Sequence, residues 1–204
     1  IKALDSSPDS ITRRMDRRDN ADGDMVFILF DSYHDLRTGF IFGVSPASVR
    51  FEQIMSNDGA NEDPSWDPIW QAKAKVNDWG WAAEMKIPFT QLRFKKNSDE
   101  VWGMIVARQI SRHNEMSFWP ALPRDASGVV HLAGELGGLQ DVEPRKQFDI
   151  TPYTVASHNT YEPEDGNPFL TGSDQRLKGG LDAKIGVSNN LTLDLTVLPD
   201  FGQV

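Results

Sequence analysis

The sequence predicts an all-β fold, and three observations lead to this prediction. Short runs of β-favouring residues are bounded by aspartate, glycine and proline, and none of them continues at the 3.6-residue period of a helix. The chain of 204 residues contains 16 glycines, 12 prolines and 6 tryptophans, a composition that suits many strands and turns. Near the end of the chain, apolar and polar residues alternate without exception from Leu177 to Val187.

The central element is a pair of apolar runs, Met25 to Phe30 and Phe40 to Val44. The residues between them, 31–39, are polar and end in glycine, which is typical of a connection between neighbouring strands. A run this short can also be a piece of buried helix, but the flanking acids and the glycine favour a strand. We expect both faces of this hairpin to be covered, which implies two stacked sheets.

Further strands are expected on both sides of a long loop. The polar segment 6–24 is a connector, and Val49 to Met55 alternates as a half-buried strand, with Glu52 on its polar side. Residues 56–68 form the longest predicted loop, and loops of this length are often functional. A second hairpin then turns at Asn77 to Gly80. The remaining predicted strands are 70–76, 81–87 and 101–110.

Composition and motifs exclude several functional classes. The net charge of −9 argues against nucleic acid as a partner, because no basic face is available to neutralise phosphates. The chain has no cysteine and no apolar run of the ~20 residues that a membrane helix needs. It also lacks a phosphate-binding glycine loop, so no nucleotide is expected, and it lacks zinc-helix and nucleophile-elbow motifs.

Two glutamates keep the question of catalysis open. Glu84 and Glu115 could act as a glycosidase pair if their carboxyl groups lie about 5 to 9.5 Å apart. The strand alternation places Glu84 opposite Met85 and Ile87, on the solvent side. A non-catalytic protein is therefore the favoured reading.

Aspartates gather at the two ends of the first predicted central strand. Calcium prefers six to eight oxygen ligands, which carboxylates and carbonyls supply. Capping and turn formation is the alternative role for aspartate at such positions, and it is favoured here. The candidate calcium ligands are Asp22, Asp24, Asp31 and Asp35.

The C-terminal alternation predicts two strands, Leu177 to Val187 and Leu191 to Val197, joined by a turn at residues 188–190. Each has one apolar and one polar face, and their lengths are close to the roughly 9 to 11 residues of a tilted membrane strand. Pattern alone leaves two readings open: the start of a membrane β-barrel, or an amphipathic hairpin packed on the preceding sheets. A composition break at Asp141 to Lys146 marks the domain boundary.

The order of motifs along the chain resembles a known family. The relevant segments are Arg37 to Pro46, Trp70 to Phe89, Val101 to Gly103, the spaced residues Arg112, Glu115, Ser117 and Trp119, and Gly186 to Val204. The segments before residue 120 resemble the family 9 carbohydrate-binding-like domain, in the version that precedes a β-barrel in a family of Gram-negative outer-membrane proteins. Gly186 to Val204 resembles the entry to that barrel. The resemblance covers nearly the whole chain, and its last segment is the most specific part.

The resemblance implies a jelly-roll-like β-sandwich over residues 1–140, followed by a linker and the initial strands of an outer-membrane-type β-barrel over residues 141–204. The first strands of the sandwich are missing, so we expect further sequence upstream. The strands present cannot close a barrel, so we expect either that the polypeptide continues beyond Val204 or that these strands pair with another chain. Relatives bind sugars on aromatic platforms, some bind calcium, and related sandwiches bind haem; haem on Met104 or His113 is the weakest of these options here.

The expected function is a non-catalytic carbohydrate-binding module of an outer-membrane protein, facing either the periplasm or the cell surface. An oligo- or polysaccharide would stack on indole rings while charged side chains bind its hydroxyls. The alternative is a plug or docking module that binds an envelope protein and no glycan. The candidate saccharide-binding residues are Trp66, Trp70, Trp119, Arg37 and Arg108.

Overall fold

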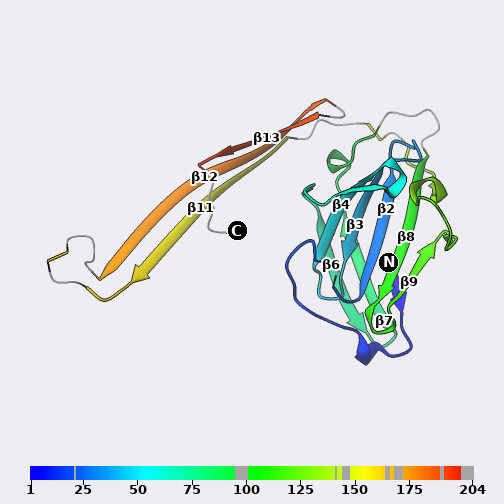
Figure 1. Ribbon diagram of the computed structural model, residues 1–204, viewed down its shortest axis with the longest axis horizontal. Helices are drawn as coiled ribbons and strands as arrows, with labels where there is room; N and C mark the ends of the chain where they lie inside the picture. Colours follow the sequence, from blue (N-terminus) through cyan, green and yellow to red (C-terminus); the bar gives the residue numbers. More distant parts are fainter. Residues whose placement is uncertain are drawn as a thin grey trace. The chain divides into compact units, whose positions relative to one another are not determined.

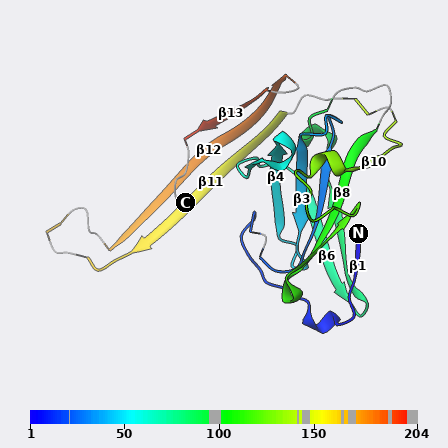
Figure 2. The same ribbon diagram turned by 45° about the vertical axis from the view of Figure 1, so that its right-hand side comes forward.

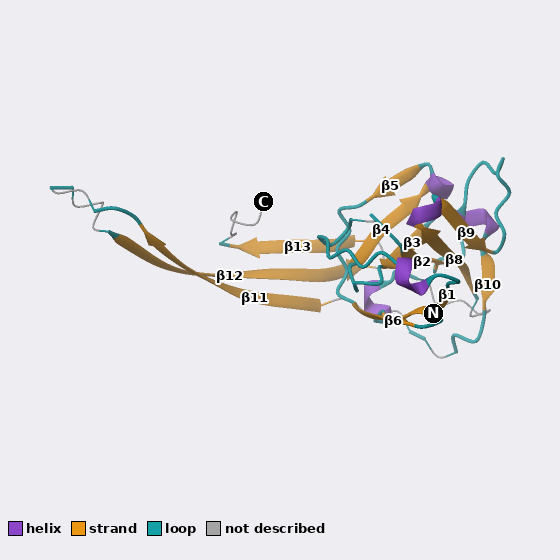
Figure 3. Cartoon of the chain, turned by 90° about the horizontal axis from the view of Figure 1, so that it is seen from below, coloured by secondary structure: helices purple, strands orange, loops and turns teal. Residues whose placement is uncertain are grey.

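The computed structural model describes residues 1–20, 22–94, 101–140, 142–143, 148–163, 166–167, 172–188 and 191–198. The chain divides into two compact units, Ile1–Arg145 and Lys146–Val204. Throughout the described residues the fold is all-β, with antiparallel sheets, and its helical segments are single turns of 3-10 helix (Figures 1 and 3). These turns are η1 (Pro8–Ser10), η2 (Asn57–Gly59), η3 (Phe89–Gln91), η4 (Ser111–His113) and η5 (Val130–Leu132).

The N-terminal unit contains two antiparallel sheets. One has the strand order β1-β7-β6, and the other has the order β10-β8-β2-β3-β4-β5, with β9 also paired to β8. Figure 2 shows β10 beside β8 at the edge of the larger sheet. The strands are β1 (Lys2–Leu4), β2 (Met25–Asp31), β3 (Gly39–Val44), β4 (Arg50–Ser56), β5 (Asn61–Asp63), β6 (Gln71–Asn77), β7 (Gly80–Lys86), β8 (Trp102–Ile110), β9 (Glu115–Trp119) and β10 (Gly134–Leu136).

The predicted central hairpin is confirmed, because β2 and β3 pair with Ile28 opposite Phe42. The inner face of the larger sheet packs against the smaller sheet: Val26 lies in one core cluster with Trp81 of β7. The outer face is covered as well, but by a connecting segment instead of a further sheet. There Leu29 and Ile41 pack against Val130 of η5. Both faces of the hairpin are therefore buried, as the unbroken apolar runs predicted.

A glycine in β3 is required by this packing. Gly43 lies directly opposite Phe27 in the β2–β3 ladder. A Cβ atom at position 43 would lie 2.6 Å from the Phe27 ring, closer than carbon atoms can approach. The aromatic ring thus occupies the space that a side chain on the neighbouring strand would fill.

Four sequence-based expectations for this unit need correction. Residues 56–68 are not one loop, since they contain η2 and β5. Trp119 ends strand β9, in a segment for which no strand was predicted. A further short strand, β10, occurs at Gly134–Leu136, where none was predicted either. Glu52 is fully buried on the inner face of β4, because both faces of this sheet are covered and the polar side of the strand cannot reach water.

The C-terminal unit is one antiparallel sheet in the order β11-β12-β13 (Figure 1). Its strands are β11 (Phe148–Thr160), β12 (Ser173–Ser188) and β13 (Leu191–Val197). The two strands predicted from alternation are confirmed as a hairpin of β12 and β13; of the predicted turn, residues 189–190 lie outside the described residues. No helix in the described ranges is long and apolar enough to cross a membrane.

Candidate functional site

The five candidate saccharide-binding residues lie in three separate places. Trp70, just before β6, is 1% exposed, and its indole N–H donates to Glu52 Oε2 at 2.9 Å. Trp66 is partly buried and packs on Phe42, with ring centroids 5.3 Å apart. Trp70 is thus a core residue, since its indole packs on Phe42 with ring centroids 5.1 Å apart and has almost no exposed surface.

The second place joins Trp119 and Arg108 on adjacent strands. Trp119 of β9 pairs with Val106 of β8, and Ser117 pairs with Arg108, so all four side chains share one face. The Arg108 guanidinium is already engaged, since it donates to Asp5 Oδ2 at 2.9 Å. Arg37 is in the third place, where it donates to Asn57 Oδ1 at 2.8 Å.

Trp119 is the most exposed of the predicted platforms, with 52% of its surface accessible. Its indole lies over Gly134 of β10, where a Cβ atom would come within 2.9 Å of the ring. On the same face of β9, the Ser117 hydroxyl donates to Glu115 Oε1 at 3.1 Å. An open indole beside a hydroxyl and a carboxylate is the chemistry that sugar recognition requires.

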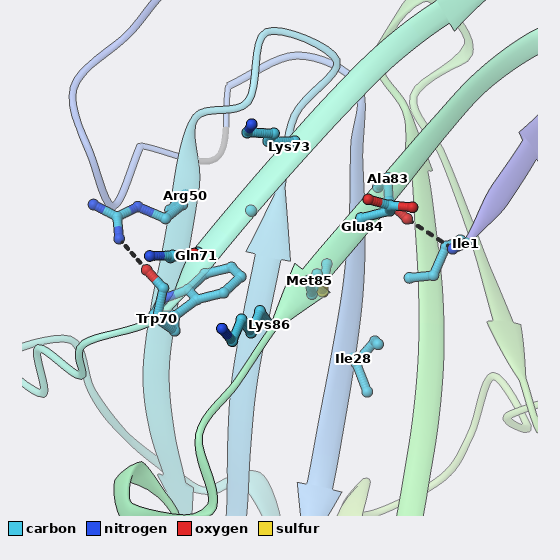
Figure 4. A pocket seen from close by; sticks show the side chains of 11 residues that line it. Ile1, Ile28, Arg50, Trp70, Gln71, Lys73, Ala83, Glu84, Met85 and Lys86 are labelled. Carbon is cyan, nitrogen blue, oxygen red and sulfur yellow. Dashed lines mark hydrogen bonds between the residues drawn. The ribbon is translucent and has the colours of Figure 1, made fainter.

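One hollow of the N-terminal unit is a groove of about 960 Å³ (Figure 4). Its rim carries three cationic side chains and one carboxylate, Glu84, and Lys73 lies opposite Glu84 in the β6–β7 ladder. The Ile1 ammonium lies at one end and donates to the Ala83 carbonyl at 2.8 Å. The groove is lined by Ile1, Ile28, Arg50, Trp70, Gln71, Ala72, Lys73, Ala83, Glu84, Met85 and Lys86.

The two glutamates considered for catalysis lie on different sheets. Glu84 is on β7 of the smaller sheet, and Glu115 is on β9 of the larger one. The groove contains Glu84 without Glu115. The groove is therefore lined by apolar side chains together with side chains of both charges. Such a lining suits the binding of a ligand.

The aspartates at the ends of β2 accept hydrogen bonds from the backbone. Asp31 is fully buried and accepts from the N–H groups of Asp35 at 3.1 Å and Leu36 at 2.8 Å. Burial raises the pKa of Asp31 despite these bonds. Asp24 accepts from Ser111 N–H at 2.8 Å, and Asp22 lies 3.7 Å from the Arg14 guanidinium.

The bonds of Asp31 are those expected of a turn-forming aspartate, whereas Asp24 connects the start of β2 to the start of η4. Asp35 likewise accepts from the N–H groups of Arg37 and Thr38 within its own turn. Within the described ranges, no group of three or more His, Asp or Glu side chains is arranged to hold a metal ion. Calcium on Asp22, Asp24, Asp31 and Asp35 remains an expectation from the resemblance.

Sequence reasoning missed a buried ionic cluster around Glu52. Arg18 of the connector forms an ion pair with Glu52, lies 2.5 Å from Asp67 Oδ1 and donates to the Pro68 carbonyl at 2.8 Å. Burial raises the pKa of Glu52, while the bonds from Trp70 and Arg18 act in the opposite direction. The signal that could have revealed the cluster is register, because Glu52 lies opposite Phe42 on the inner face.

A second ionic cluster links the two sheets of the unit. The Asp5 side chain is almost fully buried and contacts Arg108 at 2.9 Å and Arg112 at 2.7 Å. The hydrogen bond from Arg112 is the main cause of the lowered pKa of Asp5. Because Asp5 follows β1 while both arginines belong to the β8–η4 segment, this cluster connects the smaller sheet to the larger one.

The C-terminal sheet presents two chemically different faces. In the ladder, alternate residues of β11, β12 and β13 fall on the same side. On the polar side, Lys184 lies between Asp149 and Asp194, which places opposite charges next to one another. On the other side, large apolar side chains are 45–75% exposed: Phe148, Ile150, Leu177, Leu193, Leu195 and Val197.

An aromatic side chain fixes the middle of this sheet. Tyr153 pairs with Gly180, and a Cβ atom at position 180 would lie 2.2 Å from the phenol ring. The Tyr153 hydroxyl donates to the Leu198 carbonyl at 2.5 Å. The Tyr153 side chain of β11 therefore lies over Gly180 of β12, and its hydroxyl reaches the end of β13. This side chain connects all three strands.

Comparison with known proteins gives one match, and it falls on the C-terminal unit. Residues 144–204 match a family model described as a domain of unknown function, DUF5916. No curated protein and no solved structure matches the chain. The matched segment contains β11, β12 and β13.

Proposed function

We propose that this chain is the junction of an outer-membrane protein, in which a non-catalytic all-β binding module precedes the first strands of a membrane β-barrel. The exposed apolar face of the C-terminal sheet is the observation that carries this proposal. Six large apolar side chains on that face are 45–75% exposed. Soluble proteins rarely leave a contiguous apolar surface of this kind open to water.

The opposite face of the sheet agrees with this assignment. It carries charged and hydroxyl side chains, such as Asp182 opposite Thr151 and Thr196. Membrane barrels alternate in this way, with apolar residues toward lipid and polar residues toward a wet interior. An antiparallel sheet spanning a bilayer must also pair its edges, so β11 and β13 would join further strands of the barrel.

The membrane assignment can be tested with neighbouring residues on opposite faces of β13. In cells of a Gram-negative host that express the full polypeptide, we expect the protein in the outer-membrane fraction, released by detergent and not by alkaline carbonate. Leu195→Arg should impair insertion, because a lipid-facing arginine costs about 2–4 kcal/mol near the bilayer centre. Thr196→Arg, the matched control, should insert normally. Equal insertion of both variants, or release of the wild type by carbonate, contradicts the proposal.

For the N-terminal unit, a saccharide ligand is the second candidate function, and exposed Trp119 favours it. Isothermal titration against oligo- and polysaccharides should detect binding that Trp119→Ala abolishes and Trp66→Ala weakens less. Absence of any binding favours the docking module instead. The contacts of Trp66 do not distinguish a saccharide-binding module from a docking module, because this side chain packs on Phe40 and Phe42 within its own unit.

A further inference from the structure

The outer face of the C-terminal sheet changes character at a defined level. Along β12, the residues on this face are apolar or glycine from Val187 to Leu177. The next pair in the ladder is His158 opposite Gln175, followed by Thr160 opposite Ser173. All four of these side chains are exposed. The end of the β11–β12 ladder, where β11 ends and β12 begins, is therefore polar on both faces.

The length of the apolar part fits a bilayer. Eleven residues, 177–187, extend about 34 Å along the strand at roughly 3.4 Å per residue. At the tilt of about 40° found in barrels, this corresponds to a height of about 26 Å, close to the roughly 25 Å apolar band of outer-membrane proteins. The polar ends of β11 and β12 would then project beyond the membrane.

The two ends of the sheet also differ in the length of their connections. Twelve residues, 161–172, join β11 to β12 at the polar end, whereas two residues, 189 and 190, join β12 to β13 at the other end. In outer-membrane barrels the longer connections face the outside and the short turns face the periplasm. Phe148, where the chain enters β11, lies opposite Ile185, at the end with the short turn.

From these observations we infer that the N-terminal unit lies on the periplasmic side of the outer membrane. This inference rests on the proposed function and extends it, since the ligand of the N-terminal unit must then be available in the periplasm. The polar hairpin end near Glu162 faces the outside of the cell. A surface polysaccharide outside the membrane would not reach Trp119.

The absence of cysteine from the chain allows a direct test. Two variants of the full polypeptide are compared, each with one introduced cysteine and with any cysteine outside residues 1–204 replaced by serine. They are Glu162→Cys beyond β11 and Asp78→Cys in the β6–β7 turn, both at exposed positions. Intact cells of a Gram-negative host are treated with a membrane-impermeant maleimide, and labelling is normalised to that of the denatured protein. We expect Glu162→Cys to label at least tenfold more than Asp78→Cys, and permeabilisation of the outer membrane to bring both to the same level.

Labelling of Asp78→Cys in intact cells overturns the inference, and so does failure of Glu162→Cys to label before permeabilisation. Membrane fractionation of the same cultures separates these outcomes from failure of the proposed function. Protein that is absent from the detergent-extracted outer-membrane fraction overturns both proposals. Protein that is present there with the reversed labelling pattern overturns the orientation alone.

Discussion

The two units of this protein place the same kind of amphipathic strand in opposite surroundings. In the N-terminal unit, Phe42 and Trp81 are 0% and 1% exposed, because a second layer covers the inner face of each sheet. In the C-terminal unit, Leu177 is 75% exposed. Each fully buried aliphatic or aromatic side chain contributes about 1.5–3 kcal/mol to folding in water. The C-terminal sheet forgoes this gain within its own unit, and lipid would cover this face in the membrane location that we propose.

Both units contain an aromatic ring that lies over a glycine of the neighbouring strand. Phe27 lies over Gly43, and Tyr153 lies over Gly180, each across an antiparallel pair. The first ring is partly buried on the face of the larger sheet that carries Val130, and it contacts Phe51 with ring centroids 5.6 Å apart. The second ring lies on the polar face of the C-terminal sheet. The strand geometry is thus shared, whereas the surroundings of the two rings differ.

The largest expected effect concerns the ionic cluster of the N-terminal unit. Arg18→Ala leaves the Glu52 carboxylate buried without its ion-pair partner, so we expect the unit to lose about 3–5 kcal/mol of unfolding free energy. Tryptophan fluorescence during urea unfolding measures this unit selectively, because all 6 tryptophans lie between Trp66 and Trp119.

The loss should shrink at acid pH. The pKa of Glu52 is raised in the folded state, so protonation removes the unpaired charge and the stability of the variant falls as pH rises through that pKa. Arg14→Ala is the matched control, since this arginine is exposed and lies 3.7–3.8 Å from its aspartates; its cost should stay below about 1 kcal/mol. Equal losses in the two variants would show that the cluster is not stabilising.

A smaller effect is expected at the link between the two sheets. Asp5→Asn weakens charge-assisted bonds to Arg108 and Arg112 and should cost about 1.5–3 kcal/mol at neutral pH. The folded-state pKa of Asp5 is lowered, so its contribution is present above the unfolded value of about 3.9 and is lost as pH falls through the folded pKa. The unfolding free energies of Asp5→Asn and of wild type, measured in urea, should therefore differ at pH 7 and become equal as the pH is lowered to 2.

Asp9→Asn at exposed η1 serves as the control for Asp5 and should leave the unfolding free energy within about 0.5 kcal/mol of wild type at every pH. A constant difference between Asp5→Asn and wild type down to pH 2 would mean that the charge of Asp5 does not hold the sheets together.

The C-terminal sheet offers the smallest of the three stability effects. Gly180→Ala forces a methyl group into the Tyr153 ring, an overpacking that should cost about 1–3 kcal/mol. Gly179→Ala on the other face is the control, because the nearest atom would be 3.7 Å away. Urea titration followed by semi-native electrophoresis of the detergent-solubilised polypeptide measures the difference. Identical midpoints for the two variants would show that the ring does not fix the strands.

A strand could be predicted from the sequence where its own residues form a continuous apolar run or a regular alternation. The runs Met25 to Phe30 and Leu177 to Val187 were identified because their apolar content or alternation is continuous. Strands β9 and β10 were missed because they are short. β9 forms a hairpin with β8 through η4, whereas β10 pairs with a part of β8 that lies far away in the sequence.

The positions of the candidate saccharide-binding residues in the fold were harder to predict than the strands. Residue type marks an indole or a guanidinium, but the register of each strand decides where it points. Trp70 consequently lies in the core and Trp119 at an open edge. Glu52 was placed on a polar side that the fold buries, because the sequence does not show that a second layer covers both faces of β4.

The most direct test of the proposed contact between the C-terminal sheet and lipid compares a fluorophore at two adjacent positions. An NBD group is attached to Leu195→Cys or to Thr196→Cys in the full polypeptide reconstituted into bilayers, with nitroxide-labelled lipids as quenchers. We expect the group at position 195 to emit at shorter wavelength and to be quenched strongly by the lipids, while the group at position 196 resembles a water-exposed probe. Equal spectra and equal quenching at the two positions, or stronger quenching at position 196, would contradict the assignment of this face to the membrane.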